Sequence, residues 1–276
     1  MNLRSTIKLN NGVEIPRQAL GVFQIPDGQT AQCVRWALEA GYRHIDTAAV
    51  YGNERGTGQG IKDSGIPRDQ IFLTTKLWND DMRKHRVREA FEESLEKLGT
   101  DYVDLYLIHW PVAEAFVESW KELEKLYREG RVRAIGVSNF HKYHMETLLK
   151  AAEIVPAVNQ VELHPLLNQK PLSEYCRGLG IEMESYRPLG GTGATNLVGN
   201  PDIAVIAKKY GKSSAQIMVK WNLQSGNIVL VKSTHKERII ENADIYDFEI
   251  SPEDMKYLDG LNQDLHTGPS PDSFDF

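Results

Sequence analysis

The 276-residue chain has only two cysteines, Cys33 and Cys176. Two cysteines cannot form the disulfide framework of a chain this long, so we expect reduced thiols in a cytoplasmic protein. The chain also lacks long hydrophobic runs. None approaches the roughly 18 apolar residues of a membrane span, and the first residues lead into no apolar signal core. These absences argue against a membrane-bound or secreted protein.

Basic charge is scarce as well. The 38 acidic residues outnumber the 32 lysines and arginines, which gives a formal net charge of −6. Nucleic-acid binding needs a basic surface that neutralises phosphates, so we expect no nucleic-acid partner. What is present, 41% hydrophobic and 25% charged residues, is typical of a globular protein that can bury a sizeable core.

Short apolar segments alternate with segments of helical periodicity along the chain. Before them, residues 7–15 alternate in polarity around Asn11-Gly12. This predicts a β-hairpin with a type I′ turn, in which both central residues have positive φ. Further strands are expected at 19–22, 43–46, 71–75, 103–108, 132–137, 157–162, 181–185 and 228–231. Helices are expected at 30–40, 52–64, 86–98, 114–128, 144–152, 172–178, 202–209, 214–224, 238–243 and 252–261.

Apolar strands that alternate with helices predict an α/β protein built as a single parallel (β/α)₈ TIM barrel, here with an N-terminal β-hairpin and extra C-terminal helices. The alternative, a doubly wound open sheet, requires a glycine-rich fingerprint after its first strand. The first strand leads into Gly21-Val22-Phe23, which lacks that spacing, and the glycines at 56, 58 and 60 follow no strand. With no linker or change in composition, residues 1–276 are interpreted as one domain.

The working residues of such a barrel lie where the strands end, at the carboxyl face. Asp46 closes the second strand with Tyr51 just beyond it, and Lys76 and His109 follow the third and fourth strands. A charged group at the end of an apolar strand is partly desolvated and needs a partner. Asp46 and Tyr51 alone could be a helix cap and a packed tyrosine. Together with Lys76 and His109 they indicate a functional site.

These four side chains suit proton transfer. Tyrosine is a poor acid near neutrality, with an unperturbed pKa of about 10. A lysine ammonium beside the phenol lowers that pKa, and an aspartate keeps the lysine charged. A histidine adds a hydrogen bond to a carbonyl oxygen or a second proton route. The set fits protonation of the alkoxide that develops when a hydride reaches a carbonyl carbon.

Two other classes of protein are alternatives. A metal-dependent hydrolase could use Asp46, His109 and His164, but paired His-x-His ligands are missing, so we expect no metal. A non-catalytic nucleotide-binding barrel could act as a redox sensor, but the intact set of four argues against it.

Several segments resemble the signatures of the aldo-keto reductase family over nearly the whole chain. They are 41–48 (GYRHIDTA), 51–54 (YGNE), 75–78 (TKLW), 104–111 (DLYLIHWP), 136–140 (GVSNF), 159–162 (NQVE) and 232–233 (KS). Within the family, the chain is similar to the short microbial branch, which includes 2,5-diketo-gluconate reductases, methylglyoxal reductases and trypanosomatid prostaglandin F synthase. The ending, Gly268 to Phe274, is similar to that branch too.

The resemblance implies an NADPH-dependent oxidoreductase that reduces aldehydes or ketones, with Tyr51 as general acid. Its implied catalytic residues are Asp46, Tyr51, Lys76 and His109. At the nicotinamide end of the cofactor, the resemblance implies that Ser138, Asn139 and Gln160 bind the carboxamide and that Tyr186 stacks on the ring. Val22 and Leu189 are two further implied cofactor-binding residues. Phe23, Trp78 and Trp110 are expected to wall the substrate pocket, although each could equally be packing at the barrel rim.

A phosphate site is expected at the last barrel helix. Lys232 and Arg238 bracket the turn that enters it, with Ser233 and Thr234 between them. Cations, hydroxyls and free backbone N–H groups at a helix N-terminus fit a phosphate dianion, although a capped helix with a solvated basic end is an alternative. The resemblance makes this the place of the 2′-phosphate of NADPH, which favours NADPH over NADH. Glu241 and Asn242 would then lie near the adenine.

The chain departs from the family pattern at three positions, 186, 187 and 235. Arg187 stands where the family mostly has a small residue, and it either reaches the pyrophosphate or narrows the nicotinamide pocket. Tyr186 replaces a frequent tryptophan, and His235 replaces a second arginine of some relatives. The substrate stays open among diketo-gluconate, methylglyoxal, other aldehydes and a prostaglandin endoperoxide, because pocket loops set specificity. We expect a monomer.

Overall fold

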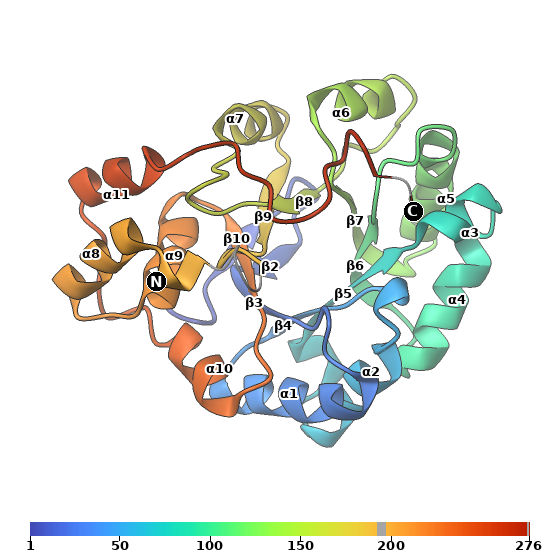
Figure 1. Ribbon diagram of the computed structural model, residues 1–276. Helices are drawn as coiled ribbons and strands as arrows, with labels where there is room; N and C mark the ends of the chain where they lie inside the picture. The colour runs from blue at the N-terminus through green and yellow to red at the C-terminus, as the bar shows by residue number, and fades with distance from the viewer. Residues whose placement is uncertain (192–196, 275) are drawn as a thin grey trace.

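The computed structural model describes residues 1–191, 197–274 and 276. Parallel strands close into a barrel in the order β10-β3-β4-β5-β6-β7-β8-β9, with helices around it (Figure 1). The barrel strands are β3 (Gln18–Gly21), β4 (His44–Asp46), β5 (Phe72–Leu77), β6 (Val103–Ile108), β7 (Val132–Ser138), β8 (Val158–Glu162), β9 (Glu182–Tyr186) and β10 (Ile228–Val231). The predicted (β/α)₈ fold is confirmed, and each predicted strand is present with its ends shifted by at most two residues.

The helices form the outer layer of the barrel, and all ten predicted helices are present in it, together with the short α3 (Asn79–Arg83), which was not predicted. They are α1 (Asp27–Ala40), α2 (Glu54–Asp63), α3 (Asn79–Arg83), α4 (Val87–Leu98), α5 (Phe116–Arg128), α6 (Lys142–Leu149), α7 (Lys170–Gly178), α8 (Pro201–Tyr210), α9 (Ser214–Gln224), α10 (Lys236–Ala243) and α11 (Pro252–Asp259). In α4, Val87, Phe91 and Leu95 recur every four residues and are buried on one face, as expected for an amphipathic surface helix. Gly99, left-handed at φ 65°, ends it.

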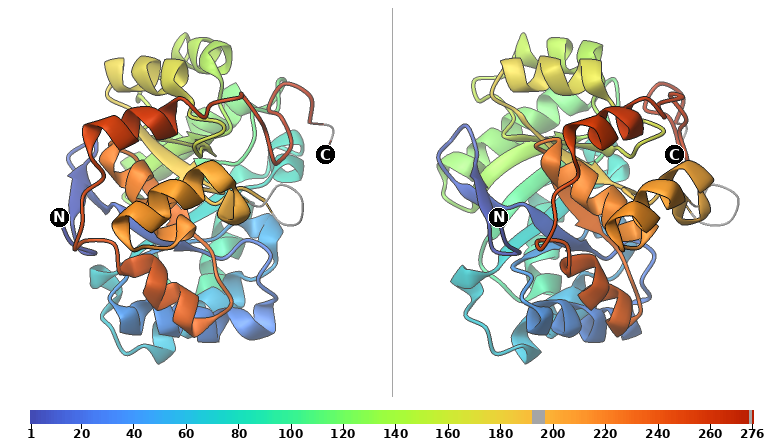
Figure 2. Two further views of the ribbon diagram at one scale, coloured as in Figure 1. Left: turned by 60° about the vertical axis from the view of Figure 1, so that its left-hand side comes forward. Right: turned by 90° about the vertical axis from the view of Figure 1, so that its left-hand side faces the viewer.

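The N-terminal hairpin closes one end of the barrel. Figure 2 shows it at the end opposite to the C-terminal segment. Strands β1 (Thr6–Lys8) and β2 (Glu14–Pro16) pair antiparallel, and Leu9 and Ile15 pack against the first residues of barrel strands, such as Phe72 and Ile228. Because this end is filled with apolar side chains, the opposite end is left for a site.

The predicted turn type of this hairpin is wrong. Gly12 has φ 88°, but Asn11 is not left-handed. The hydrogen bonds run from Leu9 N–H to Val13 O (2.8 Å) and from Gly12 N–H to Leu9 O (2.9 Å). This is a three-residue loop with one left-handed glycine, whereas a type I′ turn needs two left-handed residues.

The glycines of α2 allow close packing between helices. A Cβ on Gly58 would lie 2.1 Å from the Leu98 main-chain oxygen, and one on Gly60 would lie 2.6 Å from that of Ala31. The predicted helix is therefore confirmed, and its glycines are explained by neighbouring backbones of α1 and α4. They do not form a phosphate-binding loop.

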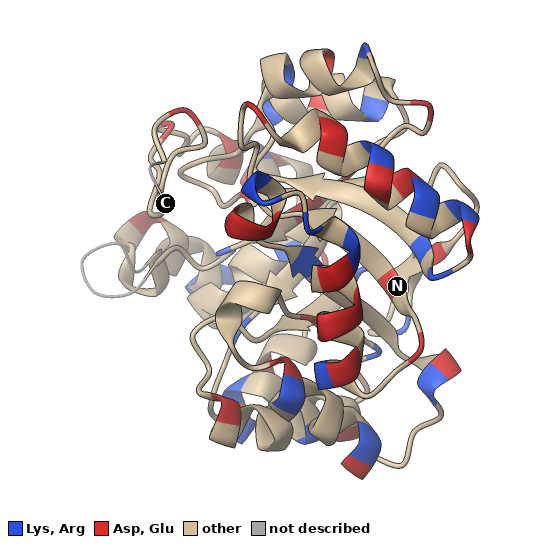
Figure 3. Cartoon of the chain, turned by 90° about the vertical axis from the view of Figure 1, so that its right-hand side faces the viewer, with Lys and Arg blue, Asp and Glu red and all other residues tan. Residues whose placement is uncertain are grey.

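Charged side chains of both signs are interspersed over the outer helices, as Figure 3 shows for the side that carries α4 and α5. Ion pairs such as Arg88–Glu129 and Arg131–Glu92 join α4 to the segment that follows α5 there. Within the described ranges, no helix has the length and apolar character needed to cross a membrane.

Candidate active site

A cavity of about 940 Å³ opens at the carboxyl end of the barrel. Of the residues predicted for the site, those that line it are Phe23, Asp46, Tyr51, Trp78, His109, Trp110, Ser138, Asn139, Gln160, Tyr186, Leu189, Lys232, Ser233, Thr234, Arg238, Glu241 and Asn242. Two do not line it, because Val22 and Lys76 are fully buried. Lys76 still reaches the cavity through its contact with Tyr51.

Asp46, Lys76 and Tyr51 form a buried chain of polar contacts. The Lys76 ammonium lies 2.6 Å from Asp46 Oδ1, 2.9 Å from the Thr47 main-chain oxygen and 3.4 Å from the Tyr51 hydroxyl. Lys76 lies within β5 rather than after it. Because side chains alternate along a strand, Thr74 and Lys76 share the interior face while Thr75 faces the helices, where it donates to Glu54.

The charges of this chain are set by opposing effects. Burial disfavours the Lys76 ammonium, but Asp46, Tyr51 and Glu184 together outweigh it, so the lysine pKa is raised and the side chain is charged. Burial also raises the pKa of Tyr51, and Lys76 only partly opposes this. The predicted direction of the lysine's effect on the phenol pKa is confirmed, but desolvation is the larger effect and the net pKa of Tyr51 is raised. Tyr51 is a neutral phenol, able to donate a proton.

His109 completes the group at the cavity wall. Its ring lies 5.6 Å from the Tyr51 ring and 5.3 Å from the Trp78 ring, edge-on to both. Burial, together with the nearby Lys76 charge, lowers the histidine pKa well below its usual range, so the imidazole is neutral. A neutral imidazole can donate one hydrogen bond to a substrate oxygen, but it is not a source of a second proton at neutral pH.

A second layer of polar side chains lies beneath this group, and of its members only Gln160 was predicted as a site residue. Gln160 Nε2 donates to Asp46 Oδ2 (2.9 Å) and to Glu184 Oε2 (2.7 Å). His44 Nε2 lies 3.7 Å from Glu184 Oε1 and 3.0 Å from Thr74 Oγ1. Glu184 lies two residues before Tyr186 on β9, so the two side chains are on the same face of the strand. This alternation was the one signal in the sequence that could have placed Glu184 near the site.

Burial and the neighbouring Asp46 raise the pKa of Glu184 to about 8. Burial lowers the pKa of His44 to about 3, so this imidazole is neutral. The layer therefore adds little net charge beneath the Lys76–Asp46 pair at neutral pH.

The predicted carboxamide-binding residues meet beside Tyr186. Asn139, with φ 65°, donates to the His109 main-chain oxygen (2.9 Å) and accepts from the Tyr186 hydroxyl (2.7 Å). Ser138 Oγ donates to the Gln160 main-chain oxygen (2.9 Å). Since both Gln160 amide hydrogens point to carboxylates, its side-chain oxygen is the atom left to face a ligand.

The predicted phosphate-binding residues gather at the start of α10. Lys232 and Arg238 are exposed and line the cavity, with Ser233 between them in the lining. Ser233 Oγ accepts from the His235 N–H (3.1 Å), which orders the turn at the helix start. Two cations beside the free N–H groups of an ordered helix N-terminus can hold a dianion.

Aromatic rings from the chain end complete the cavity wall, and sequence reasoning missed this role. The Phe276 ring is stacked parallel to Trp78 at 5.8 Å and meets Trp110 edge-on at 5.1 Å. Asn79 and Arg83 of α3, a helix also missed, each donate to the Phe276 main-chain oxygen at 3.0 Å. The two tryptophans are thus both cavity wall and rim packing.

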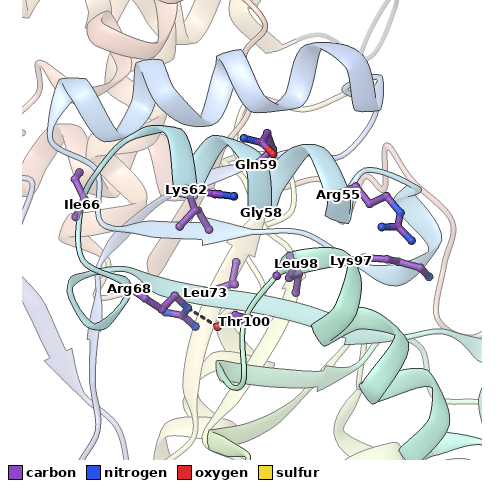
Figure 4. Close-up of a pocket in the computed structure, with 12 residues that line it drawn as sticks. Arg55, Gly58, Gln59, Lys62, Ile66, Arg68, Leu73, Lys97, Leu98 and Thr100 are labelled. Carbon is purple, nitrogen blue, oxygen red and sulfur yellow. Dashed lines mark hydrogen bonds between the residues drawn. The ribbon is translucent and has the colours of Figure 1, made fainter.

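A smaller cavity of about 530 Å³ lies between α2 and α4 (Figure 4). Arg68, which lines it, is already bound to the buried Asp104 at 2.8 Å and to main-chain oxygens. Arg55 and Lys97 face Glu96 and Glu54 at 3.5 and 3.9 Å. These three cations have partners, and none of the predicted site residues lines this cavity.

Residues 19–263 match the family model described as the Aldo/keto reductase family. The chain belongs to this family. It is therefore an oxidoreductase of a family that uses nicotinamide cofactors. The metal-hydrolase alternative fails on geometry as well: Asp46 is bound to Lys76, while His164 is held at 3.2 Å by Glu162.

Curated relatives place this aldo-keto reductase in the short microbial branch. It is 51% identical to the glyoxal reductase of Bacillus subtilis, over 100% of this chain and 99% of that protein. It is 49% identical to the 9,11-endoperoxide prostaglandin H2 reductase of Trypanosoma cruzi, over 97% of this chain and 95% of that protein.

Solved structures agree. An aldo-keto reductase from a Medee basin deep-sea metagenome superposes with a TM-score of 0.95 at 44% identity, covering 98% of this chain and 100% of that one. The Bombyx mori aldo-keto reductase, in complex with NADP, gives a TM-score of 0.91 at 36% identity, covering 99% of this chain and 97% of that one.

Proposed function

We propose that this aldo-keto reductase reduces aldehyde or ketone carbonyls to alcohols with NADPH, using Tyr51 as general acid. The observation that carries the proposal is the buried Asp46–Lys76–Tyr51 chain at the cavity, with neutral His109 beside the phenol. A bound nicotinamide supplies the hydride that reduces the carbonyl carbon.

The side chains then have separate roles. The Tyr51 hydroxyl gives its proton to the carbonyl oxygen. The Lys76 ammonium stabilises the phenolate left behind, and Asp46 keeps Lys76 charged and aimed at the hydroxyl. Neutral His109 donates a hydrogen bond that orients the carbonyl oxygen toward Tyr51.

The cavity residues fit such a cofactor. Tyr186, held by Asn139, offers a ring for stacking, and the Gln160 side-chain oxygen and Asn139 offer polar partners for a carboxamide. Lys232 and Arg238 with Ser233 favour a 2′-phosphate, which supports NADPH over NADH. Arg238→Gln should raise the Kd for NADPH at least tenfold while changing that for NADH less than threefold. Equal losses for both cofactors would contradict the 2′-phosphate assignment.

Tyr51→Phe tests the general acid. It should lower kcat for a small aldehyde by on the order of 10²–10⁴-fold, which is the contribution of one positioned proton donor, because the neutral His109 beside it is not a source of a proton. NADPH binding, followed by fluorescence, should be unchanged, since the phenyl ring keeps the wall intact. Turnover near that of the wild type in this variant would refute the proposal.

A second candidate activity, reduction of a prostaglandin endoperoxide, is favoured by the similarity to the Trypanosoma cruzi enzyme. NADPH oxidation measured with the endoperoxide and with a carbonyl panel compares the two. We further propose that the chain acts in the cytoplasm as a single-domain monomer; light scattering on purified protein tests the oligomeric state.

A further inference from the structure

Arg187 has an unusual position at the end of β9. It follows Tyr186, the last residue of the strand, and its φ of 49° lies in the left-handed region, which non-glycine residues rarely adopt. Its side chain is half-buried and lines the cavity. Such backbone conformations cluster at binding sites, where the surrounding structure holds them in place.

One nitrogen of the Arg187 guanidinium is fixed by the C-terminal segment. Nη1 donates to the Thr267 main-chain oxygen and lies 3.4 Å from Thr267 Oγ1. Thr267 is itself held, because its N–H and hydroxyl both donate to Glu162. The Glu162 oxygens also accept from Gly268 N–H and contact His164. Arg187 is therefore positioned by a neutral carbonyl, and no carboxylate of the described residues forms an ion pair with it.

The rest of the guanidinium is available to the cavity. Within residues 1–191, 197–274 and 276, Nε and Nη2 of Arg187 have no hydrogen-bond partner, and neither nitrogen is sealed in the interior. Burial raises the pKa of Tyr51 and of Tyr186, and the Arg187 charge opposes both shifts. The cation therefore lies at the tyrosine end of the cavity, directly after β9, whereas Lys232 follows β10 and Arg238 lies in α10.

We propose that Arg187 binds an anionic oxygen of a molecule that reacts in this cavity, through its planar fork of N–H donors. Two sources share this chemistry: the carboxylate of a carbonyl substrate, and the diphosphate of the nicotinamide cofactor. The proposal rests on the proposed carbonyl reduction and adds to it a preference for anionic substrates or tighter holding of the cofactor.

Arg187→Gln removes the charge and keeps a hydrogen-bond donor. The variant is compared with the wild type on 4-carboxybenzaldehyde and on its methyl ester, methyl 4-formylbenzoate, which differ in one negative charge. The Kd for NADPH is measured in parallel by fluorescence. Arg187→Lys, which keeps the charge, should retain part of the effect, and Lys62→Gln, an exposed lysine outside this cavity, is the matched control. Melting temperatures show whether each variant folds.

A substrate role predicts at least a tenfold fall in kcat/KM for the carboxylate, less than a twofold change for the ester, and an unchanged Kd for NADPH. A cofactor role predicts at least a tenfold rise in the Kd for NADPH, with both aldehydes affected alike. Changes below twofold in all three quantities, in a folded variant, overturn the proposal.

Failure of the proposed function has a different signature, because the wild type would then turn over neither aldehyde. In that case benzoate and inorganic pyrophosphate are the probes. Each is added to the wild type and to Arg187→Gln in thermal-shift measurements. A stabilisation by either probe that the substitution removes supports the anion site, and equal shifts in both proteins overturn it.

Discussion

Gln160 donates one amide hydrogen to Glu184 at 2.7 Å and, from the same nitrogen, one to Asp46 at 2.9 Å. It thereby connects a buried carboxyl at the barrel axis to the carboxylate that holds Lys76. Two full negative charges so close together in a buried site would repel strongly, and the raised pKa of Glu184 avoids this. The active-site charge pattern thus depends on Glu184, which does not line the cavity.

Glu184 should make stability fall with rising pH. Its folded pKa of about 8 lies above its ordinary value of 4.5, so the folded state binds the extra proton between these values, and its contribution to stability is lost as pH rises toward 8. Glu184→Gln removes this dependence. The free energy of unfolding of Glu184→Gln minus that of the wild type should rise from about pH 5 to about pH 9. We expect a rise of more than about 1.4 kcal/mol, the equivalent of one pKa unit, in urea titrations.

The exposed Glu174 of α7 supplies the control for this experiment. Glu174→Gln should leave the difference from the wild type constant over the same range. If the difference in unfolding free energy between Glu184→Gln and the wild type is also constant with pH, then Glu184 is charged in the folded protein at neutral pH.

Lys76 and Asp46 should be energetically coupled. Both side chains are nearly fully buried and 2.6 Å apart, so removing one leaves an uncompensated charge, which costs about 3–5 kcal/mol. Lys76→Met and Asp46→Asn should each destabilise the protein by about this amount, and the double variant by clearly less than the sum. Additive losses in chemical unfolding would mean that the pair does not interact.

Phe276 should limit the size of accepted substrates. Its ring closes the aromatic wall with Trp78 and Trp110, and Arg83 holds its main-chain oxygen. Phe276→Ala should raise kcat/KM for a bulky aryl ketone relative to methylglyoxal by at least fivefold, and Arg83→Gln should shift the ratio in the same direction by less. An unchanged ratio in both variants would remove Phe276 from the substrate pocket.

Gly58 should not tolerate alanine, although alanine normally stabilises a helix by roughly 0.5–1 kcal/mol over glycine. Its Cβ would lie 2.1 Å from the Leu98 main-chain oxygen, which cannot move without displacing the end of α4. Gly58→Ala should therefore lower the melting temperature by several degrees. Gly28→Ala in α1, where a Cβ meets nothing within 4 Å, should leave it unchanged or higher.

Much of the fold could be predicted because its signals are local. The alternation of short apolar strands with amphipathic helices predicts the barrel, and the strand-end rule then places Asp46, Tyr51 and His109 at one mouth. The errors came where a distant contact decides the outcome. Helix α3 is too short to show a period, and its Asn79 and Arg83 are explained only by Phe276, almost two hundred residues later.

By itself, the sequence determined which strands and helices form and which polar side chains reach the carboxyl end, because strand and helix periods are properties of neighbouring residues. Only the tertiary structure decided their protonation. Desolvation raises the pKa of Tyr51 above its ordinary value against the opposing charge of Lys76. Desolvation and charges from other strands together keep His109 neutral and give Glu184 its proton. These shifts depend on distances across the closed barrel, and no local pattern of residues encodes such distances.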